Sequence, residues 1–462
     1  MFLLLLGMVS VYAAGDSIQV DQTSRSRILT VVSWPLENVI QPVFNAALWP
    51  FRPPLVYFME NNVLERGVNL ITLGDHQQVM LYPTFNLKPG TFSSTGITYR
   101  HRGLLSEAGN DYWVNSISKF INNDFDFRTK YSRTKLFGTE MQGWVSYRYR
   151  MDRDAQFCVK EFDERGYTYA DSSWEVKGGV GNPLYGKWDW EYQFGVDRKL
   201  FDLPSSLEAE TLPATGDSLL LFDRFHRGFY QNFWQFPLGV QLMYNSKNFS
   251  HAPTQGQLIR MLWQYVPVSH YGGASLNHDF YTFNLVYQTF FLIGKKQYTL
   301  TRDESKANKK YLQSMNLDKT INLLSPDQLR ETLLERKVIA LQFRMRQMWD
   351  ADLDGLAPFT GFSEINGNTP LRGYERSYFD YNTYGLSLEY RWPLVDLVDG
   401  VVFNEYGIFG RDWKTQEWGN LRNSWGFGIR VRRPNLFLTR MQFGFHGLHG
   451  VSLIMTINPE FQ

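Results

Sequence analysis

Apolar residues recur at every second position over most of this chain, and this period constrains the fold more than any other feature of the sequence. Residues 187–198 are the clearest stretch: one face would carry Trp188, Trp190, Tyr192, Phe194 and Val196, and the other Asp189, Glu191, Gln193 and Asp197. Side chains of a β-strand alternate between the two faces of a sheet, so this period predicts strands with one apolar and one polar face. The same split recurs in residues 145–150 and 339–346.

Two kinds of sheet protein fit this alternation. In a soluble sandwich the apolar face would form the core, whereas in an outer-membrane barrel the aromatic residues face lipid and the polar residues face the lumen. Aromatic residues make up 16% of the 462 residues, yet the mean hydropathy is −0.34. These values disfavour a helical membrane bundle, which needs runs of roughly 20 apolar residues, and a disordered chain, which is poor in aromatic residues.

Sixteen candidate strands follow from the alternation, and an even number allows both ends of a barrel to lie on one side. They begin near Val79, Ile97, Trp113, Phe125, Met141, Tyr167, Trp188, Phe233, Leu258, Phe280, Val338, Tyr384, Val401, Trp425, Phe437 and Val451. We therefore predict an all-β fold, a 16-stranded antiparallel transmembrane β-barrel over residues 77–462, with a short helical N-terminal lead-in. Residues 295–337 are predicted as a charged periplasmic insert and residues 350–379 as a long external loop.

The first 76 residues differ in character from the rest. Residues 1–14 read MFLLLLGMVSVYAA, a short apolar stretch ending in small residues, which predicts a cleavable signal peptide. Residues 15–76 are predicted as a periplasmic segment that packs on the barrel, with short helices over residues 33–40 and 54–67. The single cysteine, Cys158, allows no internal disulfide. The predicted location is the bacterial outer membrane.

No motif nominates a cofactor, a metal or a catalytic group. Asp350 to Asp354 resemble the start of a calcium loop, but the twelfth position is Gly361 instead of a bidentate Glu, which leaves open only a looser external calcium site. His446 and His449 flank a tight glycine turn and are interpreted as polar turn residues. We expect no enzyme activity, no cofactor and no metal.

Four segments near the C-terminus form the strongest constellation. They are Leu371-Arg-Gly-Tyr374, Leu388-Glu-Tyr-Arg-Trp-Pro393, Phe403-Asn-Glu-Tyr-Gly407 and Gly426-Phe-Gly-Ile-Arg-Val-Arg432. Over residues 360–462 the sequence resembles the bacterial surface antigen superfamily, the barrels of the outer-membrane protein assembly factor and of two-partner secretion transporters. The resemblance implies that residues 350–379 fold into the lumen and that Arg372, at the tip, meets an acidic residue within a Phe-x-Asp-x-Gly pattern. This chain has Glu405 at that acidic position.

The local residue pattern agrees with the resemblance. Alternation puts Phe403, Glu405 and Gly407 on one face, and Glu389 on the face opposite Leu388. Arg372 can make a charge-assisted bond to Glu405 or to Glu389, and Gly373 lets the loop turn or approach closely beside Tyr374. The alternative is that Arg372 is an exposed loop arginine.

The two strands that must meet to close the barrel both contain proline, which cannot donate a hydrogen bond to a strand ladder. Pro83 lies in the first strand, and Pro459 lies in the last, which ends at Phe461. A weak seam between these strands follows, and the resemblance implies that client strands could add there. The alternative is that both prolines lie just beyond the paired region.

The expected function is insertion or translocation of proteins, or of lipids, at the outer membrane through this seam. Expected partners are outer-membrane lipid, client outer-membrane or secreted proteins, and separate periplasmic or outer-membrane subunits. The balance of 47 Lys and Arg against 46 Asp and Glu gives no indication of nucleic acid. The roughly 60 residues before the barrel are too few for the periplasmic receptor domains typical of the family, so we expect a member without them. Two alternatives stay open: a passive pore or structural outer-membrane protein, and a secreted β-rich glycosidase.

Overall fold

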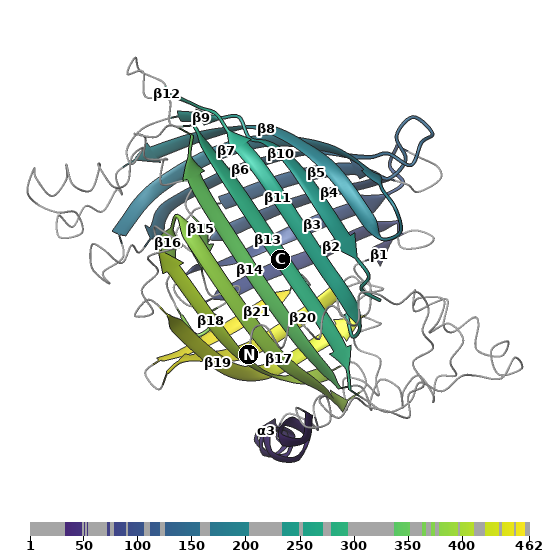
Figure 1. Cartoon of the computed structure of the whole chain (residues 1–462), viewed down its shortest axis with the longest axis vertical. Coiled ribbons are helices and arrows are strands. Elements are labelled where there is room, and N and C mark those ends of the chain that lie inside the picture. Colours follow the sequence, from purple (N-terminus) through teal and green to yellow (C-terminus); the bar gives the residue numbers. More distant parts are fainter. Residues whose placement is uncertain are drawn as a thin grey trace, which may run out of the picture.

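The computed structural model describes residues 33–48, 50, 53, 72–73, 78–88, 91–105, 111–120, 125–157, 167–202, 233–248, 253–270, 279–293, 337–351, 363–365, 371–374, 378–395, 398–410, 421–433, 437–447 and 450–457. Nearly all of them are strands of one antiparallel sheet that curves round an interior (Figure 1). The predicted all-β antiparallel class is confirmed. Residues 1–14 and 54–67 lie outside the described residues, as do the insert except Lys337 and most of residues 350–379.

The described elements follow in chain order. They are η1 (Leu36–Ile40), α3 (Gln41–Leu48), β1 (Thr72–Leu73), β2 (Val79–Lys88), β3 (Thr91–Arg102), β4 (Asp111–Phe120), β5 (Phe125–Arg133), β6 (Gln142–Phe157), β7 (Tyr167–Pro183), β8 (Trp188–Asp202), β9 (Phe233–Gln235), β10 (Leu238–Asn245), β11 (Gly256–Val266), β12 (Val268–His270), β13 (Phe280–Leu292), β14 (Val338–Asp350), β15 (Ser363–Ile365), β16 (Tyr378–Asp380), β17 (Asn382–Val395), β18 (Val398–Gly410), β19 (Arg422–Arg433), β20 (Phe437–His446) and β21 (Gly450–Ile457). Strands β15 and β16 form a separate two-stranded sheet.

The main sheet has nineteen strands, which differs from the predicted sixteen. The excess comes from three short segments, β1, β9 and β12. Strand β8 pairs with both β9 and β10, which are separated by Phe236 and Pro237, and β12 follows β11 after Pro267. Because proline has no N–H to donate, each of these prolines interrupts a strand that the alternation predicts as continuous.

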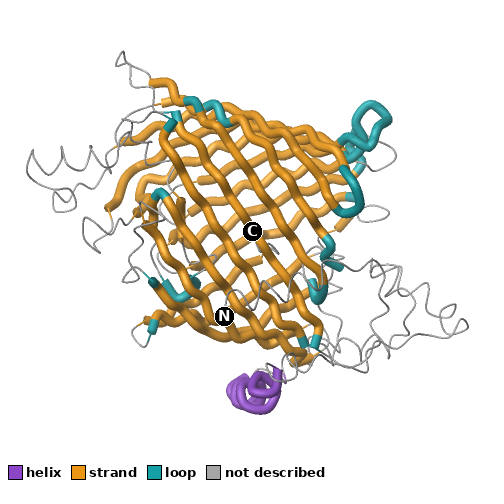
Figure 2. The backbone as a smooth tube through the Cα atoms, in the orientation of Figure 1, coloured by secondary structure: helices purple, strands orange, loops and turns teal. Residues whose placement is uncertain are grey.

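The two faces of the sheet have the polarity that the alternation predicts. Apolar side chains on the outward face are exposed, among them Ile97, Ile117, Val145, Val240, Trp263 and Leu453. The face turned to the interior buries polar and charged side chains, among them Asp126, Gln288, Gln342, Glu405, Arg430 and Gln442. Figure 2 shows how the strands curve round this interior. A soluble sandwich would bury the apolar face, so this distribution is the reverse of a soluble sheet protein.

Charges of opposite sign alternate across the interior face of β5 to β8. Arg148 lies 3.0 Å from Asp126 and 3.4 Å from Glu175, and Lys177 contacts both Glu175 and, at 3.4 Å, Asp197. Neighbouring strands therefore neutralise each other's charges, which lets a sheet bury charged groups without leaving any of these five uncompensated.

The first and last long strands lie side by side but share few pairs. Strand β2 pairs with β21 only at Asn86↔Thr456 and Leu87↔Met455, whereas β20 and β21 pair along the whole of β21. The same edge of the sheet also receives β1, which pairs with β2 at Thr72↔Met80 and Leu73↔Val79.

One helix precedes the sheet and is longer than the predicted span of residues 33–40. It continues through α3 to Leu48, although Pro42 lies within it. Just before the proline, the N–H of Gln41 bonds the carbonyl of Leu36 in the wider spacing of a π-helical turn. Such a turn is one way for a helix to accommodate proline's missing N–H and its bulky ring. Among the described residues, no helix has the length and apolar character needed to cross a membrane.

Candidate functional site

The tip of the long loop between β15 and β16 lies in the interior, against β17 to β21. Leu371 and Arg372 are both 0% exposed, and the N–H of Tyr374 bonds the Leu371 carbonyl at 3.0 Å to form a tight turn. The backbone of Leu371 has φ 83°, which is rare for a residue with a bulky side chain. Such conformations persist where the surroundings hold them, and they concentrate at functional sites.

Arg372 and Glu405 form the centre of the site. The Nε of Arg372 donates to Glu405 Oε1 at 2.8 Å, and the backbone N–H groups of Arg372 and Leu371 donate to Oε2 at 2.7 and 2.9 Å. Ser387 and Ser424 donate their hydroxyls to the same carboxylate, at 3.1 and 3.0 Å. Both oxygens of Glu405 are therefore fully bonded although the side chain is 0% exposed.

The rest of the guanidinium is bonded as well. Nη1 of Arg372 lies 2.8 Å from Glu389 Oε1 and donates to Gln442 Oε1 at 3.0 Å. The guanidinium carbon lies 3.6 Å from the centre of the Phe403 ring, a cation–π contact. Glu389 also pairs with Arg391 at 2.7 Å and with Arg430 at 3.2 Å. The two acids named as alternative partners, Glu405 and Glu389, thus both contact Arg372.

The surroundings of Arg372 favour the charged form of its guanidinium. Burial on its own would lower the pKa of the guanidinium, but the carboxylates of Glu405 and Glu389 outweigh burial and raise that pKa above its usual value. The guanidinium of Arg372 therefore stays charged at physiological pH.

Two glycines make room for the tip. A Cβ at Gly373 would lie 2.3 Å from the backbone oxygen of Phe445, so only glycine allows the tip this close to β20. A Cβ at Gly407 would lie 2.8 Å from the side chain of Leu371. Gly407 therefore provides the space that Leu371 occupies beside Phe409.

The tip is bonded to the last two strands. The carbonyl of Gly373 accepts a hydrogen bond from Ser452 of β21 at 3.1 Å and lies 3.3 Å from Nδ1 of His446 in β20. The ring of His446 also packs on Tyr374, with the centroids 5.1 Å apart. The interpretation of His446 as a turn residue is therefore wrong: its position next to the turn hid its inward orientation. His449 lies outside the described residues.

Several residues of the site carried no signal of their own in the sequence. Ser387, Ser424 and Gln442 come from three different strands, and only the register of β17 to β20 brings them to Arg372 and Glu405. The alternation of side chains could have indicated two of them. Ser424 and Gln442 lie on the polar face of their own strands, as Glu405 does on its strand, and this face is turned to the interior.

The predicted seam residues are only partly described. Pro83 is exposed on the outward face, within β2, opposite Ile97 of β3. It lies between the positions of β2 that pair with β1 and those that pair with β21. Pro459 and Phe461 lie outside the described residues. In the described part of the chain, no group of three His, Cys, Asp or Glu side chains is arranged to hold a metal ion, and of Asp350 to Asp354 only the first two residues are described.

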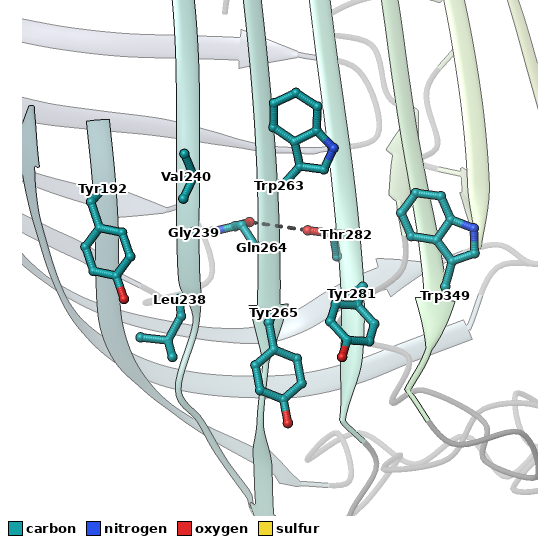
Figure 3. Close-up of a pocket in the computed structure, with 10 residues that line it drawn as sticks. All are labelled: Tyr192, Leu238, Gly239, Val240, Trp263, Gln264, Tyr265, Tyr281, Thr282 and Trp349. Carbon is teal, nitrogen blue, oxygen red and sulfur yellow. Dashed lines mark hydrogen bonds between the residues drawn. The ribbon is translucent and has the colours of Figure 1, made fainter. Parts of the chain in front are cut away.

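A second feature is a groove on the outward face of β8, β10, β11, β13 and β14. Its walls are aromatic rings with Leu238 and Val240, and the rings are those of Tyr192, Trp263, Tyr265, Tyr281 and Trp349 (Figure 3). Gly239, which has no side chain, lies among them. Tyrosine and tryptophan rings, which have a polar edge, are common on the outward apolar surface of membrane barrels.

No protein-family model matches this sequence, and no curated protein matches it. Among solved structures, the chain is similar to BamA from Haemophilus ducreyi lacking POTRA domains 1-3, with 10% identity and a TM-score of 0.51 over 82% of this chain and 69% of that chain. CdiB from Acinetobacter baumannii matches with 12% identity and a TM-score of 0.49 over 83% of this chain and 60% of that chain. CdiB from Escherichia coli matches with 10% identity and a TM-score of 0.45 over 84% of this chain and 64% of that chain. The chain has the fold of the BamA structure, and the resemblance indicated by residues 360–462 is confirmed at the level of the fold.

Proposed function

We propose that this chain is a 16-stranded outer-membrane β-barrel that takes part in the insertion or translocation of proteins through the seam between β2 and β21. The number sixteen follows from the nineteen strands of the main sheet in two steps. Strands β9 and β10 count as one strand interrupted by proline, as do β11 and β12, and the short β1 is counted as an addition to the edge. The outward apolar face and the charged interior support a membrane position. No covalent catalysis is part of this proposal.

The observation that carries the proposal is the contrast between the seam and its surroundings. Among the described residues, β2 and β21 share two residue pairs, and each ladder hydrogen bond contributes a net stability of about 1 kcal/mol. The loop tip with Arg372 contacts the last two strands from the interior, because the carbonyl of Gly373 bonds Ser452 of β21 and lies beside His446 of β20. The last two strands are thus anchored to a buried ion-pair network, while in the described part of the chain β21 shares only two pairs with β2.

This arrangement suits strand addition. Positions 81–85 of β2 pair with β3, and in the part of the chain that the structure describes no second strand pairs with them, which is the arrangement of a sheet edge within these residues. An extended client segment can add to such an edge through main-chain hydrogen bonds. Opening would cost the few pairs of β2 with β21 and leave the anchored strands in place.

A reversible crosslink tests whether the seam opens. In a Cys158→Ser background, we would replace the paired residues Leu87 and Met455 with cysteine, and as a matched control the paired residues Phe443 and Leu453 of β20 and β21. We expect oxidation of the seam pair to abolish insertion or secretion of client proteins and reduction to restore it, while the control pair stays active. Full activity with the seam crosslinked would exclude opening.

Depletion of the protein from its host distinguishes assembly from a passive pore. We expect the levels of other outer-membrane or secreted proteins to fall when this chain is depleted. Unchanged levels of those proteins, with altered permeability to small solutes, would favour the passive pore. Proteins that co-purify with the chain would identify its clients and any periplasmic or outer-membrane subunits.

A further inference from the structure

The N-terminal helix lies on the outside of the sheet, with Glu37, Gln41 and Asn45 bonded to the wall. Gln41 accepts a hydrogen bond from the hydroxyl of Tyr390 at 2.9 Å, and Asn45 accepts one from the indole N–H of Trp392 at 2.7 Å. Glu37 lies 3.2 Å from Lys337, the residue before β14. Since Glu37 is the single charged residue of 33–48, every charge of the described helix faces the sheet.

The surface that receives the helix is the outward face of β13, β14 and β17 to β19. Tyr390 and Trp392 continue the outward alternation of Leu388, which is 45% exposed, yet they are only 2% and 0% exposed themselves. Leu36 and Phe44 of the helix pack on the cluster formed by these two rings with Ile293 and Ile339. Phe44 also lies 5.1 Å from Phe427. Figure 1 shows α3 at the rim of the sheet, beside the ends of these strands.

The opposite face of the helix is exposed and apolar. Trp34, Val39 and Val43 are 61%, 52% and 61% exposed, and Pro35, Pro42 and Ala46 lie between them. Asn38 is a polar residue on this face, and its amide donates to the helix's own Trp34 carbonyl at 2.9 Å. A helix on a water-facing surface would have the reverse orientation, with its polar residues outward.

We propose that this helix lies within the outer membrane against the barrel wall, with Trp34, Val39 and Val43 in contact with lipid chains near the periplasmic interface. Its polarity is inverted in the same sense as that of the strands, and its exposed face continues their outward apolar surface. A protein partner in water would leave apolar residues exposed whenever it dissociated, whereas lipid covers this face permanently. The inference rests on the proposed membrane position of the sheet but on no step of client insertion.

Spin labels on single cysteines test the inference in the full chain. In the Cys158→Ser background, labels would replace Val39 and Val43 on the helix, Val240 as an outward strand reference, and Tyr185 as a reference in an exposed turn, where it is 90% exposed. The protein would be reconstituted in vesicles of phosphatidylethanolamine and phosphatidylglycerol. Collision with oxygen, which dissolves in hydrocarbon, would be compared with collision with a water-soluble nickel chelate.

We expect labels at positions 39 and 43 to behave like the label at 240, with severalfold higher oxygen-to-nickel accessibility than at 185. Helix labels that follow Tyr185 while Val240 remains in lipid would overturn the inference and leave the barrel intact. Exclusion of both reagents from 39 and 43 would mean that protein covers this face, and would also overturn it. Nickel accessibility at 240 as well would instead contradict the membrane position of the sheet.

Discussion

At the scale of the residue, the Arg372 tip shows how a buried charge is held in a polar interior. Arg372 has two carboxylate partners, an amide, a hydroxyl and an aromatic ring, and Glu405 accepts from backbone and side chains. A lysine could not reproduce the planar fork that bonds Glu405 and Glu389 together. Truncation of either member of the pair would leave the other as a buried charge with fewer partners, which is costly.

The first prediction concerns this pair. We expect Arg372→Ala and Glu405→Ala each to destabilise the folded protein by about 3 to 5 kcal/mol, because each leaves the other residue as a buried charge without its main ionic partner. The double variant should lose much less than the sum, since the two residues interact. The measurement is the urea midpoint of protein refolded in vesicles. Arg128→Ala is the control: this side chain is 56% exposed and its partner Asp126 keeps Arg148, so the effect should stay below about 1 kcal/mol. Strictly additive losses would show that Arg372 and Glu405 do not interact.

At the scale of the element, hydrogen bonds between polar side chains join the helix to the sheet, and these bonds form in only one rotation of the helix about its axis. Trp392 is 0% exposed, and its indole N–H donates to Asn45. Because a buried donor without an acceptor is costly, this bond fixes the rotation of α3 on the wall. The same rotation exposes Val39 and Val43.

The second prediction follows from that bond. Asn45→Ala should destabilise the protein by about 1 to 3 kcal/mol, since the indole N–H of Trp392 loses its acceptor. In a Trp392→Phe background, where no N–H is present, the same substitution should have little effect. Asn38→Ala is a matched control, because the Asn38 amide bonds only the helix's own backbone. Unfolding in urea would report all four variants, and an equal loss in both backgrounds would rule out a role for this hydrogen bond in docking.

At the scale of the whole molecule, the distribution of apolar and polar residues determines whether the outward face is stable against water or against hydrocarbon. Apolar and aromatic residues cover the outward face, and the charges pair with one another in the interior. The formal charge of +1 comes from 47 Lys and Arg against 46 Asp and Glu, and some of these charges pair with one another in the interior. Such a molecule is stable where hydrocarbon surrounds it.

The third prediction tests this polarity with two adjacent residues of β10. Val240→Arg places a charge on the outward face, and we expect it to destabilise the protein in vesicles by about 1 to 4 kcal/mol, depending on its depth in the bilayer. Gln241→Arg places the same charge in the interior, opposite Glu191, and should have a much smaller effect. Unfolding in vesicles measures both. A larger loss for the interior variant would reverse the assigned faces and favour a soluble sheet protein.

The sequence alone determined the class of fold, the positions of the long strands and the residues at the centre of the site. Alternation is a local property, so the apolar and polar faces of each strand can be identified from its own residues. The segment from Leu371 to Tyr374 resembles the corresponding loop of a family in which that loop enters the lumen. Even so, Pro237 and Pro267 interrupt two strands in a way that the apolar period does not register.

Only the tertiary structure decided which strands meet and which residues then touch. The roles of Ser387, Ser424, Gln442 and His446 depend on the register of neighbouring strands, and a shift of one residue would turn their side chains away from Glu405 and the loop tip. The two pairs at the seam and the inverted orientation of the helix depend on contacts between segments more than 300 residues apart. Period and composition are properties of neighbouring residues, whereas register, closure and docking depend on contacts that form only when the whole chain is folded.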